Sequence, residues 1–191
     1  DGDEGVRLDA LPADEKQLEP FDVVIAIDPD ASKLVPAFCE ALAKHVLQNG
    51  CGLWWVAGEK FSVEAFKQTA STKSLVDLLP VVPDLQFAES VANLGLGLAH
   101  TNTYPWTLTP EGEDGVAAKI TRIAETRDET KILWPRLPGF HLAFPIKQLK
   151  PAATALALHE NCDPRLKRDG RGMPVLASHF VGAGRVIFCG V

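Results

Sequence analysis

The sequence lacks the closely paired cysteines that identify small zinc-binding or disulfide-rich proteins. Its four cysteines, Cys39, Cys51, Cys162 and Cys189, form no C-x-x-C pair and follow no regular spacing. Zinc sites and small disulfide frameworks need shorter separations between their cysteines. We therefore predict no metal and no other cofactor. Cys39 and Cys189 fall within apolar elements, where a free thiol acts as a small core residue.

The sequence also lacks a signal peptide, a long apolar run and an excess of basic residues. No apolar run reaches the roughly 18 residues that a membrane-spanning helix needs. There are 19 Lys and Arg residues against 25 Asp and Glu, a net charge of -6. Nucleic-acid binding needs clustered cations, so we expect no nucleic-acid partner. The basic residues at 165–171 are interpreted as a solvated loop, since Asp163 and Asp169 flank them.

An initiating Met is absent as well, because the chain begins at Asp1 and stops at Val191 directly after an apolar run. We interpret both ends as the boundaries of a domain excised from a longer protein. Residues 1–20 are acidic and weakly patterned and are predicted to form a leader or linker. Residues 21–191 are predicted to form one domain. Signals and membrane spans are then expected outside this sequence.

What the sequence does contain is the pattern of a complete β-α-β unit in residues 21–60. Residues 21–27 and 52–57 are continuous apolar runs, and residues 32–48 between them have helical spacing with Ser32 as N-cap. Strands that are apolar on both faces are typical of parallel sheets covered by helices on both sides. We predict an α/β three-layer sandwich, flavodoxin-like, with a mainly parallel sheet.

The rest of the chain is predicted to add short helices, turns and strands. Helices are expected at 62–66, 74–79 and 116–125, turns at 110–115 and 130–137, and strands at 104–109, 140–146 and 153–159. Residues 174–180 and 185–191 are predicted to pair as a C-terminal antiparallel hairpin, because the loop between them is rich in glycine.

Several short motifs follow one another in an order that resembles a known family. They are Asp22-Val-Val-Ile-Ala-Ile-Asp28, Asn49-Gly-Cys-Gly-Leu-Trp-Trp-Val-Ala-Gly58, Leu78-Leu-Pro-Val-Val82, Leu108-Thr-Pro-Glu-Gly112, Trp134-Pro-Arg-Leu-Pro138, Leu149-Lys-Pro-Ala-Ala153 and Gly184-Arg-Val-Ile-Phe-Cys-Gly190. Their order over residues 21–191 resembles the class I glutamine amidotransferase-like domain of large bacterial membrane-anchored proteins, often joined to a von Willebrand factor A domain. A fainter resemblance extends to trehalose-utilisation-protein-like domains. The resemblance implies a flavodoxin-like sheet, and it does not imply that the amidotransferase reaction survives.

The residues that would carry that reaction are not where the resemblance places them. Amidotransferases hold a catalytic Cys on a tight strand-to-helix turn, which here would follow Val56. The turn has no Cys, Ser or Thr, and Ser62 falls several residues late. Cys51 lies between two glycines, but it follows the negative end of a helix dipole, which raises a thiol pKa. We predict that Cys51 is a buried or unreactive packing residue.

The histidines offer no clear catalytic partner. His179 lacks the His-x-Glu spacing of the amidotransferase dyad, and His100 and His141 have no companion at ligand spacing. His159 and Glu160 adjoin Asn161-Cys162-Asp163, the one local cluster of ligand-capable groups. This cluster is either a weak metal or acid-base site or a polar loop, and we favour the loop.

An open α/β sheet binds its ligands at the carboxyl ends of its strands, which here carry Asp28, Asp30, Gly58 and Glu59. One interpretation is an acidic crevice that hydrogen-bonds hydroxyl groups or holds a cation. The other, which we favour, is that Asp28-Pro29-Asp30 caps the following helix. Gly58 stands alone and not in a glycine-rich phosphate-binding pattern.

We therefore predict a non-catalytic amidotransferase-like domain that serves as a binding or interaction module in a larger, membrane-anchored bacterial protein. Its expected partners are other domains of the same chain or another protein, with membrane contact only through flanking segments. The alternative is a hydrolase or carbohydrate-modifying enzyme. That alternative requires Asp28, Asp30 and Glu59 to meet a His, with at least one raised pKa. A third possibility is a structural domain that spaces its neighbours.

Overall fold

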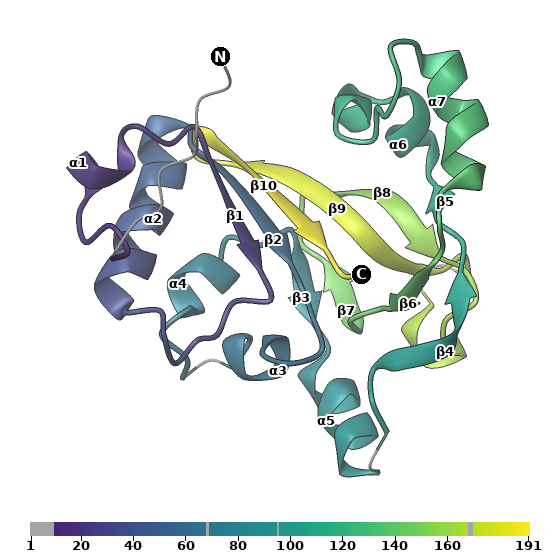
Figure 1. Cartoon of the computed structure of the whole chain (residues 1–191), viewed down its shortest axis with the longest axis horizontal. Helices are drawn as coiled ribbons and strands as arrows, with labels where there is room; N and C mark the ends of the chain where they lie inside the picture. Colours follow the sequence, from purple (N-terminus) through teal and green to yellow (C-terminus); the bar gives the residue numbers. More distant parts are fainter. Residues whose placement is uncertain (1–9, 68, 95, 168–169) are drawn as a thin grey trace.

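A computed structural model describes residues 10–67, 69–94, 96–167 and 170–191 and shows a mixed α/β fold (Figure 1). Its main sheet has six strands in the order β1-β2-β10-β9-β8-β5. These strands are β1 Val23–Ile27, β2 Gly52–Val56, β10 Gly184–Cys189, β9 Met173–Val181, β8 Thr154–His159 and β5 Thr107–Leu108. The neighbours β1, β2 and β10 run parallel to one another, and β10, β9, β8 and β5 alternate in direction.

The prediction of a mainly parallel sheet is therefore wrong. The parallel pairs are β1–β2 and β2–β10, whereas β10–β9, β9–β8 and β8–β5 are antiparallel. The predicted C-terminal hairpin is confirmed, because Gly184 pairs with Val181. Gly182 in its turn has φ +57°, and a Cβ there would lie 2.2 Å from the carbonyl oxygen of Leu47. The glycine thus lets β9 reverse directly into β10.

The first predicted helix forms, but it begins later than its sequence pattern indicates. Helix α2 spans Pro36–Asn49, with Pro36 in its first turn and Gly50 at its C-cap in the left-handed conformation, φ +81°. Ser32 does not cap it, because the backbone N–H and hydroxyl of Ser32 both donate to the carboxylate of Asp30. Residues 30–32 therefore form a side-chain-closed turn that precedes the helix.

Shorter elements make up the rest of the chain. They are α1 Glu15–Leu18, α3 Ser62–Ala65, α4 Lys73–Val76, β3 Val81–Pro83, α5 Leu85–Asn93, β4 Ala99–Tyr104, α6 Pro110–Asp114, η1 Val116–Lys119, α7 Arg127–Leu133, η2 Trp134–Arg136, β6 Phe140–Leu142, β7 Ile146–Leu149 and η3 Pro164–Leu166. Strand β3 pairs with β7, and β4 pairs with β6, in two small antiparallel sheets. No helix among the described residues is long and apolar enough to cross a membrane.

Several of these elements differ from the sequence-based expectations. The predicted turn at 110–115 is mostly helix α6, and the helix predicted at 116–125 is only the short η1. The turn predicted at 130–137 contains the end of α7 and then η2. The strand predicted at 140–146 is divided between β6 and β7, since Pro145 lacks the N–H that a continuous strand would use. Helix α1 lies in the predicted leader, and its Leu18 is buried in the core.

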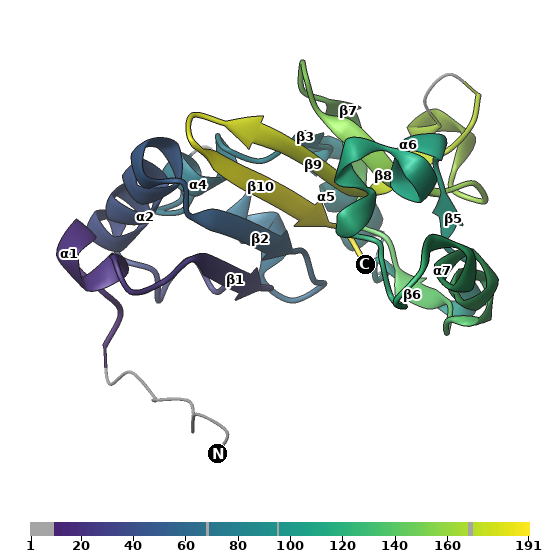
Figure 2. The same ribbon diagram turned by 90° about the horizontal axis from the view of Figure 1, so that it is seen from above.

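The main core lies on one face of the sheet, under α2 and α4. Trp55 of β2 and Phe188 of β10 point into it and are fully buried. Phe66, just after α3, joins them: its ring centroid lies 5.5 Å from that of Trp55 and 4.9 Å from that of Phe144. Figure 2 shows α1, α2 and α4 together on this side of β1, β2 and β10.

The opposite face of the same strands does not fit a three-layer sandwich. Val23, Ile25 and Ile27 of β1 are 54%, 56% and 72% exposed. A strand covered on both sides would bury these side chains, so the prediction of helices over both faces is wrong for the described part of the chain at β1.

Candidate functional site

The carboxylate of Asp28 binds the loop that follows β2. It accepts hydrogen bonds from the backbone N–H groups of Lys60 (3.1 Å) and Phe61 (3.2 Å) and from the hydroxyl of Ser62 (2.8 Å). Asp28 itself has φ +37°, a left-handed conformation that Asp tolerates better than most residues. The chain therefore turns sharply at the end of β1, and Asp28 joins the ends of two neighbouring strands.

Gly58 lies close to this carboxylate. A Cβ on Gly58 would lie 2.4 Å from Cγ and 2.5 Å from Oδ2 of Asp28, so no larger residue fits without displacing that side chain. The N–H of Gly58 donates to the hydroxyl oxygen of Ser62 at 2.8 Å. Gly58, Ser62 and Asp28 thus form one hydrogen-bonded turn, in which Ser62 is fully buried.

Asp30 and Glu59 lie near this turn but point to other partners. Asp30 accepts from the hydroxyl and N–H of Ser32, and the hydroxyl hydrogen bond lowers the pKa of the Asp30 carboxyl. Oε1 of Glu59 accepts from the N–H of Ala99 at 3.4 Å, and it lies so close to Gly97 that a Cβ on that residue would clash with it. The structure therefore brings Asp28, Gly58 and Ser62 together, while Asp30 and Glu59 each stabilise a different loop.

This arrangement is that of a capped loop junction. The carboxylate of Asp28 is satisfied by protein N–H and O–H donors, and Ser62 donates its hydroxyl proton to that carboxylate. A general base, by contrast, has a free lone pair aimed at a substrate and a pKa tuned to its task. The prediction that Asp28-Pro29-Asp30 caps the following helix is wrong, because α2 has no side-chain cap hydrogen bond and Asp28 instead binds the loop before α3.

Cys51 is buried at the other end of β2. Its side chain is 3% exposed, and its Sγ donates to the carbonyl oxygen of Gly52 at 3.4 Å. Burial raises the pKa of the Cys51 thiol. The prediction that Cys51 is a buried packing residue is confirmed.

The cluster around His159 is built into an aromatic core. The His159 ring is buried, with its centroid 4.6 Å from that of Tyr104 and 5.1 Å from that of Phe140. Asp163 accepts from the guanidinium of Arg165 at 2.8 and 3.0 Å, and this hydrogen bonding lowers the pKa of Asp163 to about 2. Among the described residues, no group of three or more His, Cys, Asp or Glu side chains is placed to hold a metal ion.

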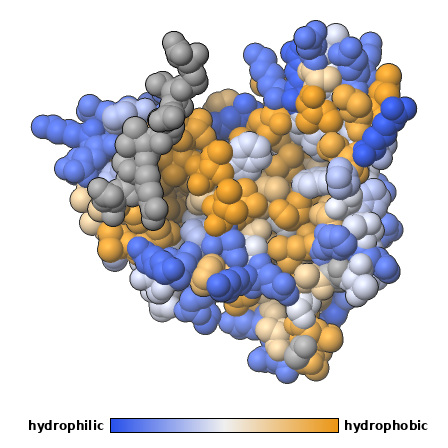
Figure 3. All heavy atoms as spheres, in the orientation of Figure 1, coloured by the Kyte–Doolittle hydropathy of each residue, from blue (hydrophilic) through white to orange (hydrophobic). Residues whose placement is uncertain are grey.

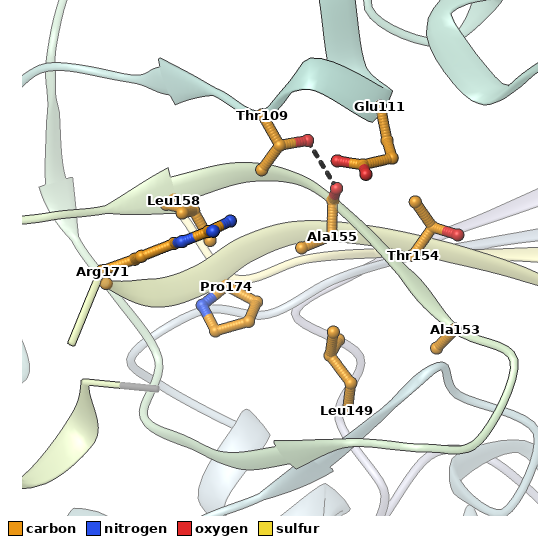
Figure 4. A pocket seen from close by; sticks show the side chains of 10 residues that line it. Thr109, Glu111, Leu149, Ala153, Thr154, Ala155, Leu158, Arg171 and Pro174 are labelled. Carbon is orange, nitrogen blue, oxygen red and sulfur yellow. Dashed lines mark hydrogen bonds between the residues drawn. The ribbon is translucent and has the colours of Figure 1, made fainter. Parts of the chain in front are cut away.

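An open depression of about 320 Å³ lies between α6, β8 and the start of β9 (Figure 4). Its charged side chains are Glu111 and Arg171. The hydroxyl of Thr109 donates to the carbonyl oxygen of Ala155 at 2.7 Å and accepts from the N–H of Gly112 at 3.0 Å. Thr109 thus fixes the start of α6 to β8 and is not free to bind a ligand.

The most exposed apolar surface of the sheet lies over β1, β2 and β10, on the side away from α2. We call it the open face, and it consists of Val23, Ile25, Ile27, Trp54, Val56, Ile187 and Cys189. The strand register places these side chains in rows, with Ile25 beside Trp54 and Trp54 beside Ile187. Figure 3 shows apolar side chains gathered over this part of the molecule. Exposed apolar surface that is continuous across strands is typical of an interaction site.

The open face also has a free edge. Strand β1 ends the strand order, and among the described residues it pairs with β2 alone. Gly52 donates to the carbonyl oxygen of Asp22, and Asp28 donates to that of Val56, both at 2.8 Å. The N–H and C=O groups of successive residues alternate in direction along a strand. Those of Val23, Ile25 and Ile27 therefore point away from β2, toward the free edge.

Sequence reasoning did not identify the open face as a site. A continuous apolar run predicts burial on both faces, and nothing in Phe21–Ile27 shows whether the covering layer lies inside or outside the same segment of chain. The burial pattern of β1, in which Val23, Ile25 and Ile27 are exposed, became visible only in the structure.

Comparisons with known proteins show the fold alone. No protein-family model and no curated protein matches this sequence. Among solved structures, the chain is similar to the cytoplasmic protein STM3548 from Salmonella typhimurium, with a TM-score of 0.57 and 14% identity over 95% of this chain and 64% of that one. It is also similar to the cytoplasmic protein STM1381 from Salmonella typhimurium LT2, with a TM-score of 0.52 and 12% identity over 93% and 63%. The chain thus spans less than two thirds of each of these two structures.

Proposed function

We propose that this domain is a non-catalytic, amidotransferase-like interaction module of a larger bacterial protein, and that it binds another part of that protein through its open face. The observation that carries this proposal is the exposure of Val23, Ile25 and Ile27 in adjacent positions on one side of β1. Fully burying an aliphatic side chain of this size contributes about 1.5–3 kcal/mol. Three such residues beside half-buried Trp54 and Ile187 give a surface able to hold a partner domain.

The contacts at the strand ends support the non-catalytic half of the proposal. Asp28 and Ser62 are hydrogen-bonded to the loop that they hold together. These hydrogen bonds explain why an acidic and a hydroxyl side chain stand at these positions, without invoking a substrate. The resemblance to amidotransferase-like domains of membrane-anchored proteins agrees with a role in holding domains together, with the membrane reached only through other segments.

The experiment that tests the proposal measures Ile25→Thr in two contexts, residues 1–191 alone and the full polypeptide that contains them. In residues 1–191, where Ile25 is 56% exposed, we expect the free energy of unfolding to change by less than about 0.5 kcal/mol. In the full polypeptide we expect a loss of at least about 1.5 kcal/mol, because the substitution removes buried apolar area and buries a hydroxyl. Urea titration followed by tryptophan fluorescence gives both values.

The matched control is Ile132→Thr, the same substitution at a residue of α7 that is 59% exposed. It should leave the free energy of unfolding unchanged in both contexts. Equal effects of Ile25→Thr in residues 1–191 and in the full polypeptide would overturn the proposal, since they would show that nothing covers the open face.

The alternative function, a hydrolase or carbohydrate-modifying enzyme, gains no support from these contacts. It requires a carboxylate with a raised pKa at the strand ends. The hydroxyl of Ser32 instead lowers the pKa of Asp30, and Glu59 accepts a backbone N–H from another loop. We therefore place the interaction module first.

A further inference from the structure

We infer that a polypeptide segment outside residues 1–191 covers the open face with a helix and adds a parallel strand to the free edge of β1. This inference rests on the proposed function, because it specifies what the open face binds. It is carried by the direction of the backbone groups of β1, by the handedness of parallel connections and by the extent of the matched structures.

The edge of β1 is suited to a further strand. The N–H and C=O groups of Val23, Ile25 and Ile27 point away from β2, and the strand has no bulge in its pairing with β2. Native sheets protect such edges with charged side chains, prolines or covering segments. Strand β1 has only apolar residues along its length, so its edge matches a strand that is normally paired.

The open face is the face that a helix on the outer side of the sheet would cover. Strand β1, helix α2 and strand β2 form a parallel connection that runs from the edge of the sheet toward its middle. Parallel connections are right-handed in about 98% of cases. A right-handed connection that leads in the opposite direction, from the middle of the sheet out to a strand beside β1, places its helix on the opposite face. That face bears Val23, Ile25 and Ile27.

The matched structures show that this fold occurs in longer chains. More than a third of each of the two Salmonella chains lies outside the match, although the match covers 93–95% of the present chain. These two chains therefore carry elements beyond the matched fold, and a further covering layer is what an apolar parallel strand exposed on one face requires.

A second copy of this chain is the less suitable occupant. Two-fold pairing of β1 with itself about Ile25 would place Asp22 of one copy opposite Asp28 of the other, twice per dimer. Like charges directly opposite each other destabilise strand pairing, and each chain already carries a net charge of -6. A strand from elsewhere in the polypeptide need not carry acidic residues at these positions.

Backbone hydrogen exchange in the full polypeptide, measured residue by residue by NMR, tests the inference. Amides of Val24 and Ala26 point toward β2 and serve as internal controls, whereas those of Val23, Ile25 and Ile27 point toward the free edge. We expect the second set to exchange as slowly as the controls, because an added strand accepts their hydrogen bonds. Without that strand they should exchange at least about 100-fold faster than the controls.

Cross-strand nuclear Overhauser contacts to β1 then identify the neighbour. Contacts from Ile25 to residues of the same molecule outside 1–191, in the pattern of parallel strands, support the inference. It is overturned by fast exchange, by contacts to a second copy in a mixed-isotope sample, by contacts to residues within 1–191 other than β2, or by a gene that encodes no further segment. Fast exchange together with a large Ile25→Thr effect in the full polypeptide would overturn the added strand alone and leave the proposed function standing.

Discussion

The two faces of β1, β2 and β10 are built from the same strands and have opposite surroundings. On the covered face, Trp55 and Phe188 are fully buried and pack with Phe66 under the helices. On the open face, Ile25 and Ile27 are more than half exposed, although they alternate with residues of the covered face along one strand. Apolar side chains on both faces of a parallel strand indicate two covering layers. The described residues supply one of them, and the second is where we place the binding function.

The largest expected effect separates the faces directly. Phe66→Ala should lower the free energy of unfolding of residues 1–191 by about 3–5 kcal/mol, because it leaves a cavity beside Trp55 and Phe144. Phe180→Ala, at the open side of β9, removes an equally large ring that is 65% exposed and stacks under Arg185. It should cost less than about 1 kcal/mol. Chemical denaturation of both variants checks this, and similar losses would show that the two sides are equally buried.

The next prediction concerns the ionisation of the Cys39 thiol, which is buried between α2 and the covered face. Burial, with the nearby Glu40 carboxylate adding to it, raises the pKa of the Cys39 thiol on α2 to about 11. The folded state then keeps the neutral thiol while the unfolded state ionises from about pH 9. The stability from this group is complete below about pH 9 and is lost as the pH rises toward 11. The loss reaches up to about 2–3 kcal/mol, from about 1.4 kcal/mol for each unit of pKa.

Cys39→Ala isolates this contribution from the other groups that titrate in the same range. Urea unfolding of the wild type and the variant, measured from pH 8 to pH 11, should show a shallower decline for Cys39→Ala above pH 9. Parallel curves for the two proteins would mean that the thiol is accessible to water and that the helix layer over the covered face is loose.

The sequence predicted the elements of the β-α-β unit because their signals are local. The apolar runs at β1 and β2 and the helical spacing of α2 are each contained in one short, continuous segment of the sequence. The direction of the other strands is not local, because it depends on the connections through residues 57–172. The exposure of Ile25 was also beyond prediction, since an apolar strand has the same sequence whether its cover lies in the same segment or in another one.

The candidate site was predicted in composition but not in geometry. Asp28 and Gly58 were identified because they follow parallel strands, and the structure places them in contact. The partner of Asp28 was not predictable, because it is set by a φ of +37° and lies in the loop before Ser62, more than thirty residues along the chain. The turn that Asp30 and Ser32 form likewise moved the start of α2 to Pro36.

The smallest of the expected effects concerns the hydrogen bonds by which Asp28 joins the end of β1 to the loop that follows β2. Asp28→Asn keeps one acceptor oxygen but turns an amide N–H₂ toward the N–H groups of Lys60 and Phe61, so we expect a loss of about 1–2 kcal/mol in the free energy of unfolding. Asp30→Asn is the matched control: it removes the same charge from a side chain whose partners, Ser32 and the exposed Lys33, are its near neighbours in the chain, and it should cost less than about 0.5 kcal/mol. Thermal and urea unfolding of both variants in residues 1–191 measure the difference. An Asp28→Asn variant with an unchanged free energy of unfolding would mean that the carboxylate does not stabilise the loop. Asp28 would then become a candidate ligand-binding residue.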